Sequence, residues 1–309
     1  MVVVRHPCVR WPACALPLFA GLVLGGLPRH SRAQEMSPAF QGYVLDFNSP
    51  TDPTLQSQVE AIDVRLRAKR GMETYQTAVG VLDLETRRLA LIRPDAIDYA
   101  ASVPKIGILL AWFQLHPEAA TQLDATTRHE LGMMIKASSN EMAAKYSQLL
   151  GLKPIQEVLN ADGFYDAKHG GGLWVGKHYG QGTERYLDPV GGHSHAATVR
   201  QLLRYYLLLE QGKLVSPAAS KTMREIFASS DIPHRDDKFV QGLAGRDVQL
   251  LRKSGWWETW FHDTAIVTGH GRHYIIAALT HHPQGDAYLA ELAAAVDDVV
   301  TAGPPARSR

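Results

Sequence analysis

Ser102 and Lys105 are three positions apart in the stretch from Tyr99 to Phe113. Serine is a good helix cap and Pro104 suits a first helical turn, so we expect a helix to begin here. One helical turn then brings the hydroxyl and the amine onto the same face. A lysine amine among apolar side chains loses its proton more easily and can take one from a serine hydroxyl. The pair predicts a nucleophilic serine, although a capping serine followed by a surface lysine is the commoner meaning of this spacing.

Two further short stretches carry side chains that an acyl-transfer site needs. Ser138 and Asn140 stand at a break between two predicted helices, where a hydroxyl can relay a proton and an amide can orient a substrate. Lys253, Ser254 and Gly255 lie on a predicted strand. There the lysine and the hydroxyl can bind a substrate carboxylate, and the glycine lets a ligand lie along the backbone.

The composition is typical of a globular protein with a large core. The chain has 309 residues, 45% of them hydrophobic and 20% charged, with a formal net charge of +1. This length fits one large domain or two closely joined ones. A near-neutral charge without a strongly basic helix argues against nucleic acid or a membrane surface as a partner.

The first 33 residues differ from the rest of the chain. A basic start precedes an apolar run from about residue 13 to 27, and Ser31–Ala33 resembles a small-x-small cleavage site. This pattern predicts a secretory signal peptide rather than an uncleaved anchor, and therefore a secreted or periplasmic protein. Both cysteines, Cys8 and Cys14, lie within this segment, so no disulfide or thiol chemistry is expected after cleavage.

The remaining pattern predicts helices and strands in a definite order. After a flexible leader at 34–53, we expect a helix over 54–69 and a β-hairpin over 75–92. Apolar residues at helical spacing then predict mostly helix from 102 to about 227, interrupted by a glycine-rich loop at 168–195. Three successive strands and a last helix follow, at 248–256, 261–268, 274–280 and 287–300.

This order of elements predicts an α+β fold. Strands from both parts of the chain should join in one antiparallel sheet of about five strands, flanked by the N- and C-terminal helices. The segments 54–101 and 241–303 would form a discontinuous α/β subdomain. The helices between them, in 102–240, would form an inserted all-helical subdomain.

Together the three polar stretches resemble the Ser-x-x-Lys, Ser-Asp-Asn and Lys-Thr-Gly motifs of class A β-lactamases and penicillin-binding proteins. The stretches occur in the family's order and on the expected elements, and the resemblance covers most of the chain from residue 54 to 300. It implies a β-lactamase/transpeptidase-like fold. Ser139 stands where the family has Asp and Ser254 where it has Thr, while Trp256 and Trp257 would narrow the rim of the cleft.

The resemblance implies catalytic roles for four residues. Ser102 would be the acylated nucleophile and Lys105 its partner in proton transfer, while Ser138 would pass the proton to the leaving nitrogen. Class A enzymes also carry Glu-x-x-Leu-Asn, whose glutamate activates the hydrolytic water, and Glu184-Arg-Tyr-Leu-Asp188 in the long loop is close to this pattern. Glu184 is therefore the candidate deacylating base, and a solvated loop charge is the alternative.

The same resemblance implies how the substrate would be held. Asn140 would bind the side-chain amide of the substrate. Lys253 and Ser254, followed by Gly255, would bind its carboxylate. The oxyanion would lie between the backbone N–H groups of the nucleophile and of Trp256.

The leading hypothesis is a secreted class A-type β-lactamase that hydrolyses β-lactam amides through an acyl-enzyme on Ser102. A D-alanyl-D-alanine carboxypeptidase or penicillin-binding protein with slow deacylation, and a non-catalytic cell-wall binding homologue, are the alternatives. We expect a monomer that binds a small β-lactam or a peptidoglycan peptide, with no nucleic acid and, after signal cleavage, no membrane. His193 and His195 suggest a metal, but the Ala-Ala that follows lacks the acid of a metallo-hydrolase motif. They are therefore expected to be loop or surface imidazoles, with no metal and no cofactor.

Overall fold

The computed structural model describes residues 38–303 except 181 and 183. The predicted signal peptide at 1–33 lies outside these residues, which belong to one compact unit that begins at Met36. The division into two subdomains stays a prediction. The part of the predicted leader that is described contains a short helix, α1 (Pro38–Gln41), and two buried side chains, Phe40 and Leu45.

An antiparallel sheet of five strands runs through this unit, and the predicted α+β fold class is confirmed. The early hairpin joins the late strands because β1 (Thr77–Asp83) pairs with β10 (Arg272–His281), from Thr77 opposite Thr280 to Asp83 opposite Tyr274. β10 also pairs with β9 (Trp260–Gly269), and β9 pairs with β8 (Val248–Trp257), which leaves β8 at one edge of the sheet. In order across the sheet the strands are β2 (Arg88–Ile92), β1 (Thr77–Asp83), β10 (Arg272–His281), β9 (Trp260–Gly269) and β8 (Val248–Trp257).

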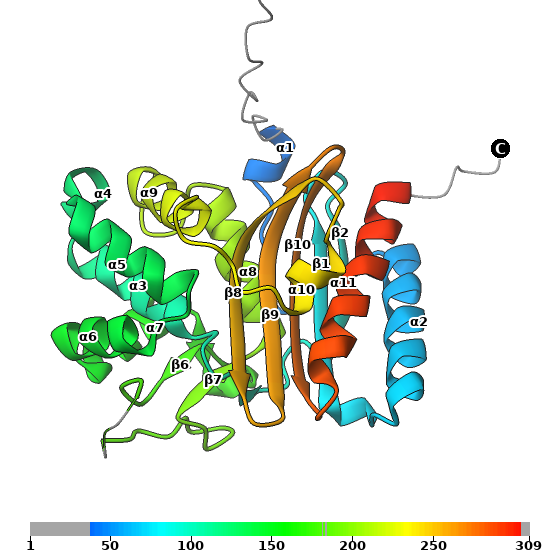
Figure 1. Cartoon of the computed structure of the whole chain (residues 1–309), viewed down its shortest axis with the longest axis horizontal. Helices are drawn as coiled ribbons and strands as arrows, with labels where there is room; N and C mark the ends of the chain where they lie inside the picture. Colours follow the sequence, from blue (N-terminus) through cyan, green and yellow to red (C-terminus); the bar gives the residue numbers. More distant parts are fainter. Residues whose placement is uncertain (1–37, 181, 183, 304–309) are drawn as a thin grey trace, which may run out of the picture. The chain divides into compact units, whose positions relative to one another are not determined.

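Two long helices cover one face of the sheet, α2 (Pro53–Arg70) and α11 (Gly285–Ala302) (Figure 1). Asp52 caps the first turn of α2 by accepting a hydrogen bond from the Leu55 N–H, as an N-cap carboxylate should. The apolar sides of both helices share a core with the sheet. A short helix, α10 (Lys238–Gly242), packs against α11.

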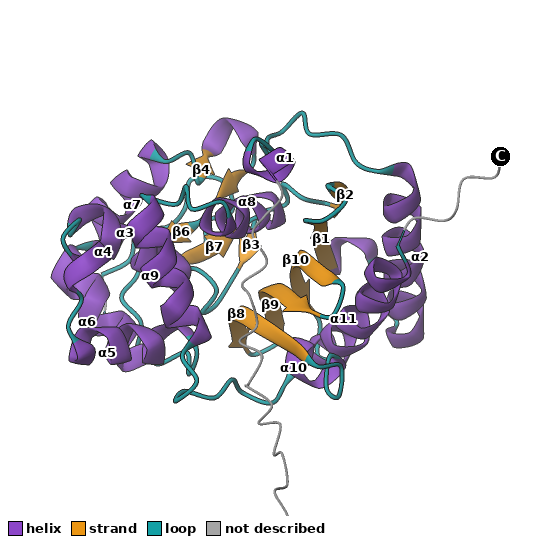
Figure 2. Ribbon diagram, turned by 90° about the horizontal axis from the view of Figure 1, so that it is seen from above, coloured by secondary structure: helices purple, strands orange, loops and turns teal. Residues whose placement is uncertain are grey.

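The remaining helices lie on the other side of the sheet (Figures 1 and 2). One of them, α8 (Val199–Glu210), contacts β1 and β10 directly. Another, α3 (Lys105–Leu115), packs against three of the other helices on this side, and its side chains are buried from Lys105 to Ala111. Among the described residues, no helix has both the length and the apolar character needed to cross a membrane. The helices are α3 (Lys105–Leu115), α4 (Ala119–Gln122), α5 (Ala125–Ile135), α6 (Asn140–Leu150), α7 (Leu152–Ala161), α8 (Val199–Glu210) and α9 (Pro217–Ala228).

The glycine-rich stretch predicted as a loop at 168–195 is more ordered than expected. It contributes to a small sheet in the order β3-β7-β6 and to a two-stranded sheet of β4 and β5. These strands are two or three residues long, too short for a period of alternation to be recognised. They are β3 (Asp98–Tyr99), β4 (Tyr165–Asp166), β5 (Gly171–Gly172), β6 (Trp174–Val175) and β7 (His195–Ala197), with a 3₁₀ turn, η2, at Ala167–His169.

Candidate active site

Ser102 lies in a tight turn before α3 rather than at the cap of the helix. Backbone bonds from Val103 N to Ala100 O (2.9 Å) and from Lys105 N to Ser102 O (3.3 Å) close successive four-residue turns. The α-helix itself begins at Lys105, so the predicted N-cap role of Ser102 is wrong. Ala101 has φ 48°, a left-handed conformation that is costly for a residue with a side chain. The turn leaves Ser102 half-buried at the wall of a cavity.

The Lys105 amine is fully buried behind Ser102. Its Nζ donates to Ser138 O at 2.6 Å and to Asn140 Oδ1 at 2.8 Å, and lies 3.4 Å from Ser138 Oγ. Burial lowers the pKa of Lys105 from 10.5 to about 7. A neutral amine has two N–H bonds, which these two acceptors use. Its lone pair is then available to accept a proton.

Ser138 lies between two buried amines. Lys253 Nζ, from the edge strand β8, donates to Ser138 Oγ at 2.8 Å and to Ser254 O at 2.6 Å. Burial, and then the nearby charge of Lys105, hold the pKa of Lys253 well below its usual value. Ser138 itself has φ 58°. Because its Oγ accepts from Lys253, its own proton can point toward Lys105, which makes a short relay of hydrogen bonds.

The break between α5 and α6 positions this relay. Ser139, where the resemblance expects Asp, caps α6 by accepting a hydrogen bond from Met142 N at 3.2 Å. Asn140 is the first residue of α6, and its side chain lines the cavity while its Oδ1 holds Lys105. Serine therefore supplies the cap that this loop requires.

The edge strand β8 passes very close to the turn that carries Ser102. A Cβ atom at Gly255 would lie 2.8 Å from Ala100 O and 3.2 Å from Ser102 N, so glycine is needed here. The next residue, Trp256, lines the cavity and is 53% exposed. Ser254 is half-buried and is not part of the cavity lining.

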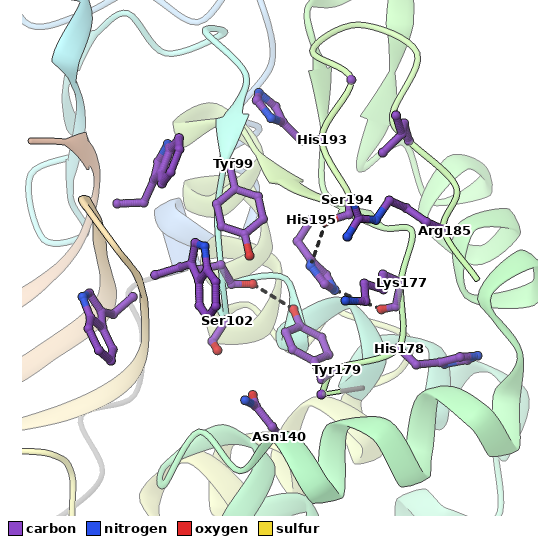
Figure 3. Close-up of a pocket in the computed structure, with 17 residues that line it drawn as sticks. Tyr99, Ser102, Asn140, Lys177, His178, Tyr179, Arg185, His193, Ser194 and His195 are labelled. Atoms are coloured by element: carbon purple, nitrogen blue, oxygen red, sulfur yellow. Dashed lines mark hydrogen bonds between the residues drawn. The ribbon is translucent and has the colours of Figure 1, made fainter. Parts of the chain in front are cut away.

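The cavity has a volume of ≈ 460 Å³ and is lined by Ser102, Asn140, Tyr99, three tryptophans and residues of the loop between β6 and β7 (Figure 3). The structure therefore brings Ser102, Lys105, Ser138, Asn140 and Lys253 together, with Gly255 and Trp256 beside them. Among the described residues, no group of three His, Cys, Asp or Glu side chains is placed to hold a metal ion.

Tyr179 and His195 form a buried platform that the sequence did not reveal. The Tyr179 hydroxyl donates to Ala101 O at 3.0 Å, and its ring centroid lies 4.6 Å from Lys105 Nζ. His195 stacks on Tyr179 with centroids 4.2 Å apart and bonds through Nε2 to Lys177 O at 2.9 Å. Burial lowers the pKa of His195 to about 4, so the ring is neutral. The prediction of a loop or surface imidazole is wrong for His195, which is buried and is the first residue of β7.

Glu184 does not line the cavity. Its carboxylate accepts a hydrogen bond from Tyr186 OH at 2.8 Å and lies 3.5 Å from His178 Nε2, with 55% of the side chain exposed. Asp188, four residues later, is instead buried and accepts hydrogen bonds from Gly191 N at 2.8 Å and His193 N at 2.7 Å. Asp188 therefore holds the turn of this loop. In the part of the chain that the structure describes, no acidic side chain lines the cavity.

Comparisons with known proteins agree with this architecture. The model of the beta-lactamase enzyme family matches residues 119–300. A β-lactamase from Sphaerobacter thermophilus DSM 20745 has a TM-score of 0.62 at 14% identity, over 81% of this chain and 99% of that one. The structure of PBP-A has a TM-score of 0.62 at 16% identity, over 81% and 98%. A variant of the class A β-lactamase of the last common ancestor of Gram-negative bacteria has a TM-score of 0.62 at 19% identity, over 79% and 98%.

At these identities the likeness to solved structures shows the fold alone. A search of curated proteins gives no match.

Proposed function

The chain belongs to the beta-lactamase enzyme family, and from this premise we propose that it is a serine hydrolase that is acylated on Ser102. Its substrates would be β-lactams or peptides that end in D-alanyl-D-alanine. The observation that carries the proposal is the pair of buried amines, Lys105 and Lys253, joined through Ser138 beside the Ser102 turn. Burying two amines lowers the stability of the fold, so such a pair is expected where proton transfer requires it.

In the proposed acylation the neutral Lys105 amine takes the proton of the Ser102 hydroxyl, and Oγ attacks the carbonyl carbon of the substrate. The carbon–nitrogen bond then breaks. Ser138 gives its proton to the leaving nitrogen and recovers one from Lys105, a step supported by the 3.4 Å separation of Ser138 Oγ and Lys105 Nζ. The proton that leaves Ser102 is thus balanced by the one gained by the leaving group.

Binding roles follow from the same arrangement. We propose that the N–H groups of Ser102 and Trp256 hold the oxyanion, where the loss of one donor typically costs ~3–4 kcal/mol of barrier. Lys253 and Ser254 would hold the carboxylate on the leaving-group side of the substrate. Asn140 would hold the amide on the acyl side.

We propose that the acyl-enzyme persists, as in a penicillin-binding protein or carboxypeptidase with slow deacylation. The absence of an acidic side chain from the described cavity lining favours this reading, as does the contact of Glu184 with Tyr186 and His178. Rapid class A turnover, the leading hypothesis from sequence, needs Glu184 as the base that activates water. The motif Glu184-Arg-Tyr-Leu-Asp188 is the observation that favours this second candidate.

A fluorescent penicillin tests both steps. Ser102 should be labelled, Ser102→Ala should not, and the label should persist for hours with little hydrolysis of nitrocefin. Label lost within minutes, with nitrocefin turnover that stops in Glu184→Gln, would instead establish the class A reaction. A protein that takes no label would be a non-catalytic cell-wall binding homologue, and the proposal would be wrong.

We also propose that the protein is secreted or periplasmic and acts as a monomer. The basic start, apolar run and small-residue site in 1–33 support export. N-terminal sequencing of the mature protein should give a residue near 34, and cell fractionation should find it outside the cytoplasm. Light scattering would measure the mass of the mature form.

A further inference from the structure

The loop between β6 and β7 brings two cations to the wall of the cavity. Lys177 and Arg185 both line it, together with Ser102 and Asn140. Figure 3 shows the two basic side chains on the same side of the cavity as Ser194 and His195, extending from the loop toward its middle.

The backbone holds these two cations side by side. Lys177 and Arg185 face each other in an isolated antiparallel bridge. Side chains directly opposite across such a bridge point to the same face with Cβ atoms about 4.5–5.5 Å apart, and like charges there are destabilising. The neighbouring bond from Tyr186 N to Gly176 O, at 2.6 Å, fixes the same two segments together. The backbones of Lys177 and Arg185 can therefore not separate without breaking this pairing.

Nothing in the described part of the chain neutralises this pair. Neither cation has a carboxylate within 4 Å there, and the nearest acid in sequence, Glu184, contacts His178 and Tyr186 instead. Their charges also act on the cavity, since Lys177 and Arg185 add to the lowering of the His195 pKa that burial causes first. A cavity lined by one sign of charge concentrates ligands of the opposite sign.

We propose that Lys177 and Arg185 form a second carboxylate subsite, so that the protein prefers substrates with an acidic group on the acyl side. The proposal rests on the proposed function, because Lys253 takes the carboxylate of the leaving group and Asn140 the acyl amide. With those two ends fixed, the rest of the acyl group extends along the loop that carries Lys177 and Arg185. A guanidinium and an ammonium side by side suit a carboxylate, which accepts hydrogen bonds from both.

Three penicillins with the same phenyl side chain provide matched probes: benzylpenicillin is uncharged there, carbenicillin carries a carboxylate and ampicillin an ammonium group. Titrated into Ser102→Ala, which removes the nucleophile, carbenicillin should bind about tenfold more tightly than benzylpenicillin, and ampicillin more weakly. The ratio of the carbenicillin and benzylpenicillin dissociation constants should approach one in a Lys177→Met, Arg185→Gln background. The preference should also weaken with added salt.

Two further variants separate this subsite from general charge and from misfolding. Lys168→Met removes an exposed cation of η2 that does not line the cavity, and the ratio should stay as in the parent. Lys177→Arg keeps the charge and should keep the preference. An acidic preference that the double variant leaves unchanged would overturn the subsite.

An acidic β-lactam and an acidic peptide would both present a carboxylate to Lys177 and Arg185. Acetyl-Glu-D-Ala-D-Ala and acetyl-Gln-D-Ala-D-Ala form a second matched pair for the same titration. Tighter binding of the acidic member of either pair supports the subsite and shows whether a β-lactam or a peptide supplies the carboxylate. If neither pair shows this preference, the subsite is overturned. Acylation of wild-type Ser102 by benzylpenicillin is measured separately. Acylation without acidic preference refutes only the subsite, whereas acidic preference without acylation refutes only the hydrolase.

Discussion

Arg252 and Lys253 are consecutive residues of β8, and both are buried. Arg252 bonds to both oxygens of Asp263, at 2.7 and 2.9 Å, and to the carboxylate of Asp237. Burial alone would lower the pKa of Arg252, but these carboxylates raise it overall. Among the described residues, the Lys253 amine donates only to uncharged oxygens, those of Ser138 and Ser254, and its pKa is lowered. One strand thus carries a cation compensated by carboxylates beside an uncompensated amine.

The difference separates what holds β8 in place from what works in the cavity. The Arg252 network ties β8 to β9 and to the start of α10, because Asp263 also accepts a hydrogen bond from Phe239 N at 3.0 Å. Removing the carboxylate partner of a buried charge such as Arg252 destabilises the fold. A buried amine that has no carboxylate partner, such as Lys253, lowers the stability of the intact protein. Lys253 is therefore retained at a cost to stability, as expected of a functional group.

The largest effect on stability should come from breaking the compensated side. Asp263→Ala leaves the Arg252 guanidinium buried without its main partner and should lower the free energy of unfolding by about 3–5 kcal/mol. Urea denaturation measures this loss. Asp298→Ala is the matched control, because the Asp298 side chain is 68% exposed and Arg246 keeps its second partner, Asp297, so the pair should contribute less than about 1 kcal/mol. Equal losses in the two variants would contradict the structural role of the Arg252 network.

The uncompensated side should respond in the opposite sense. Lys253→Met removes a buried amine that has no carboxylate partner among the described residues, so the free energy of unfolding should be unchanged or higher. The rate of acylation by a fluorescent penicillin should instead fall by about 10²- to 10³-fold, the usual cost of losing one fixed electrostatic contact. A loss of stability as large as that of Asp263→Ala would show that Lys253 is structural too.

Lys105 extends the comparison to pH, with a pKa near 7 caused by burial. Only the neutral amine can take the Ser102 proton, and at pH 6 roughly a tenth of it is neutral. Acylation at pH 6 should therefore be about tenfold slower than on a plateau above pH 8, with the midpoint near 7. Because the unfolded chain binds this proton up to its usual pKa, stability should also rise with pH above about 7. A flat rate profile between pH 6 and 9, with the fold intact by circular dichroism, would rule out Lys105 as the acceptor.

Much of this arrangement could be predicted because its signals are local. The hairpin of β1 and β2 and the three late strands are short runs rich in apolar residues and separated by turns, and the turn between β1 and β2 ends at Arg87, with φ 61°. The stretches around Ser102 and Ser138 each precede a helix, the stretch around Lys253 lies on the edge strand β8, and the structure brings the three together. Their catalytic roles stay predictions.

The loop could not be predicted, because its order depends on pairing between distant segments. His195 is buried because β7 pairs with β3 and with β6, and strands of two or three residues leave no pattern in the sequence. Glu184 shows the converse limit. A local likeness to a motif says nothing about where a carboxylate points, and here it contacts Tyr186 and His178. The pairing of Lys177 with Arg185 is equally invisible before the fold is known.

The smallest effect on stability should come from two buried tyrosine hydroxyls, one with a hydrogen-bond partner and one without, which are an uncharged counterpart of Arg252 and Lys253. Tyr179 OH donates to Ala101 O at 3.0 Å, whereas Tyr205 OH, also buried, has no hydrogen-bond partner among the described residues. Tyr179→Phe should lower the free energy of unfolding by about 1 kcal/mol, and Tyr205→Phe should leave it unchanged or raise it. Because Ala101 is the residue held in a left-handed turn before Ser102, Tyr179→Phe should also slow acylation, though less than Lys253→Met. If the two variants unfold alike and acylate at the parent rate, the Tyr179 bond does not position the Ser102 turn.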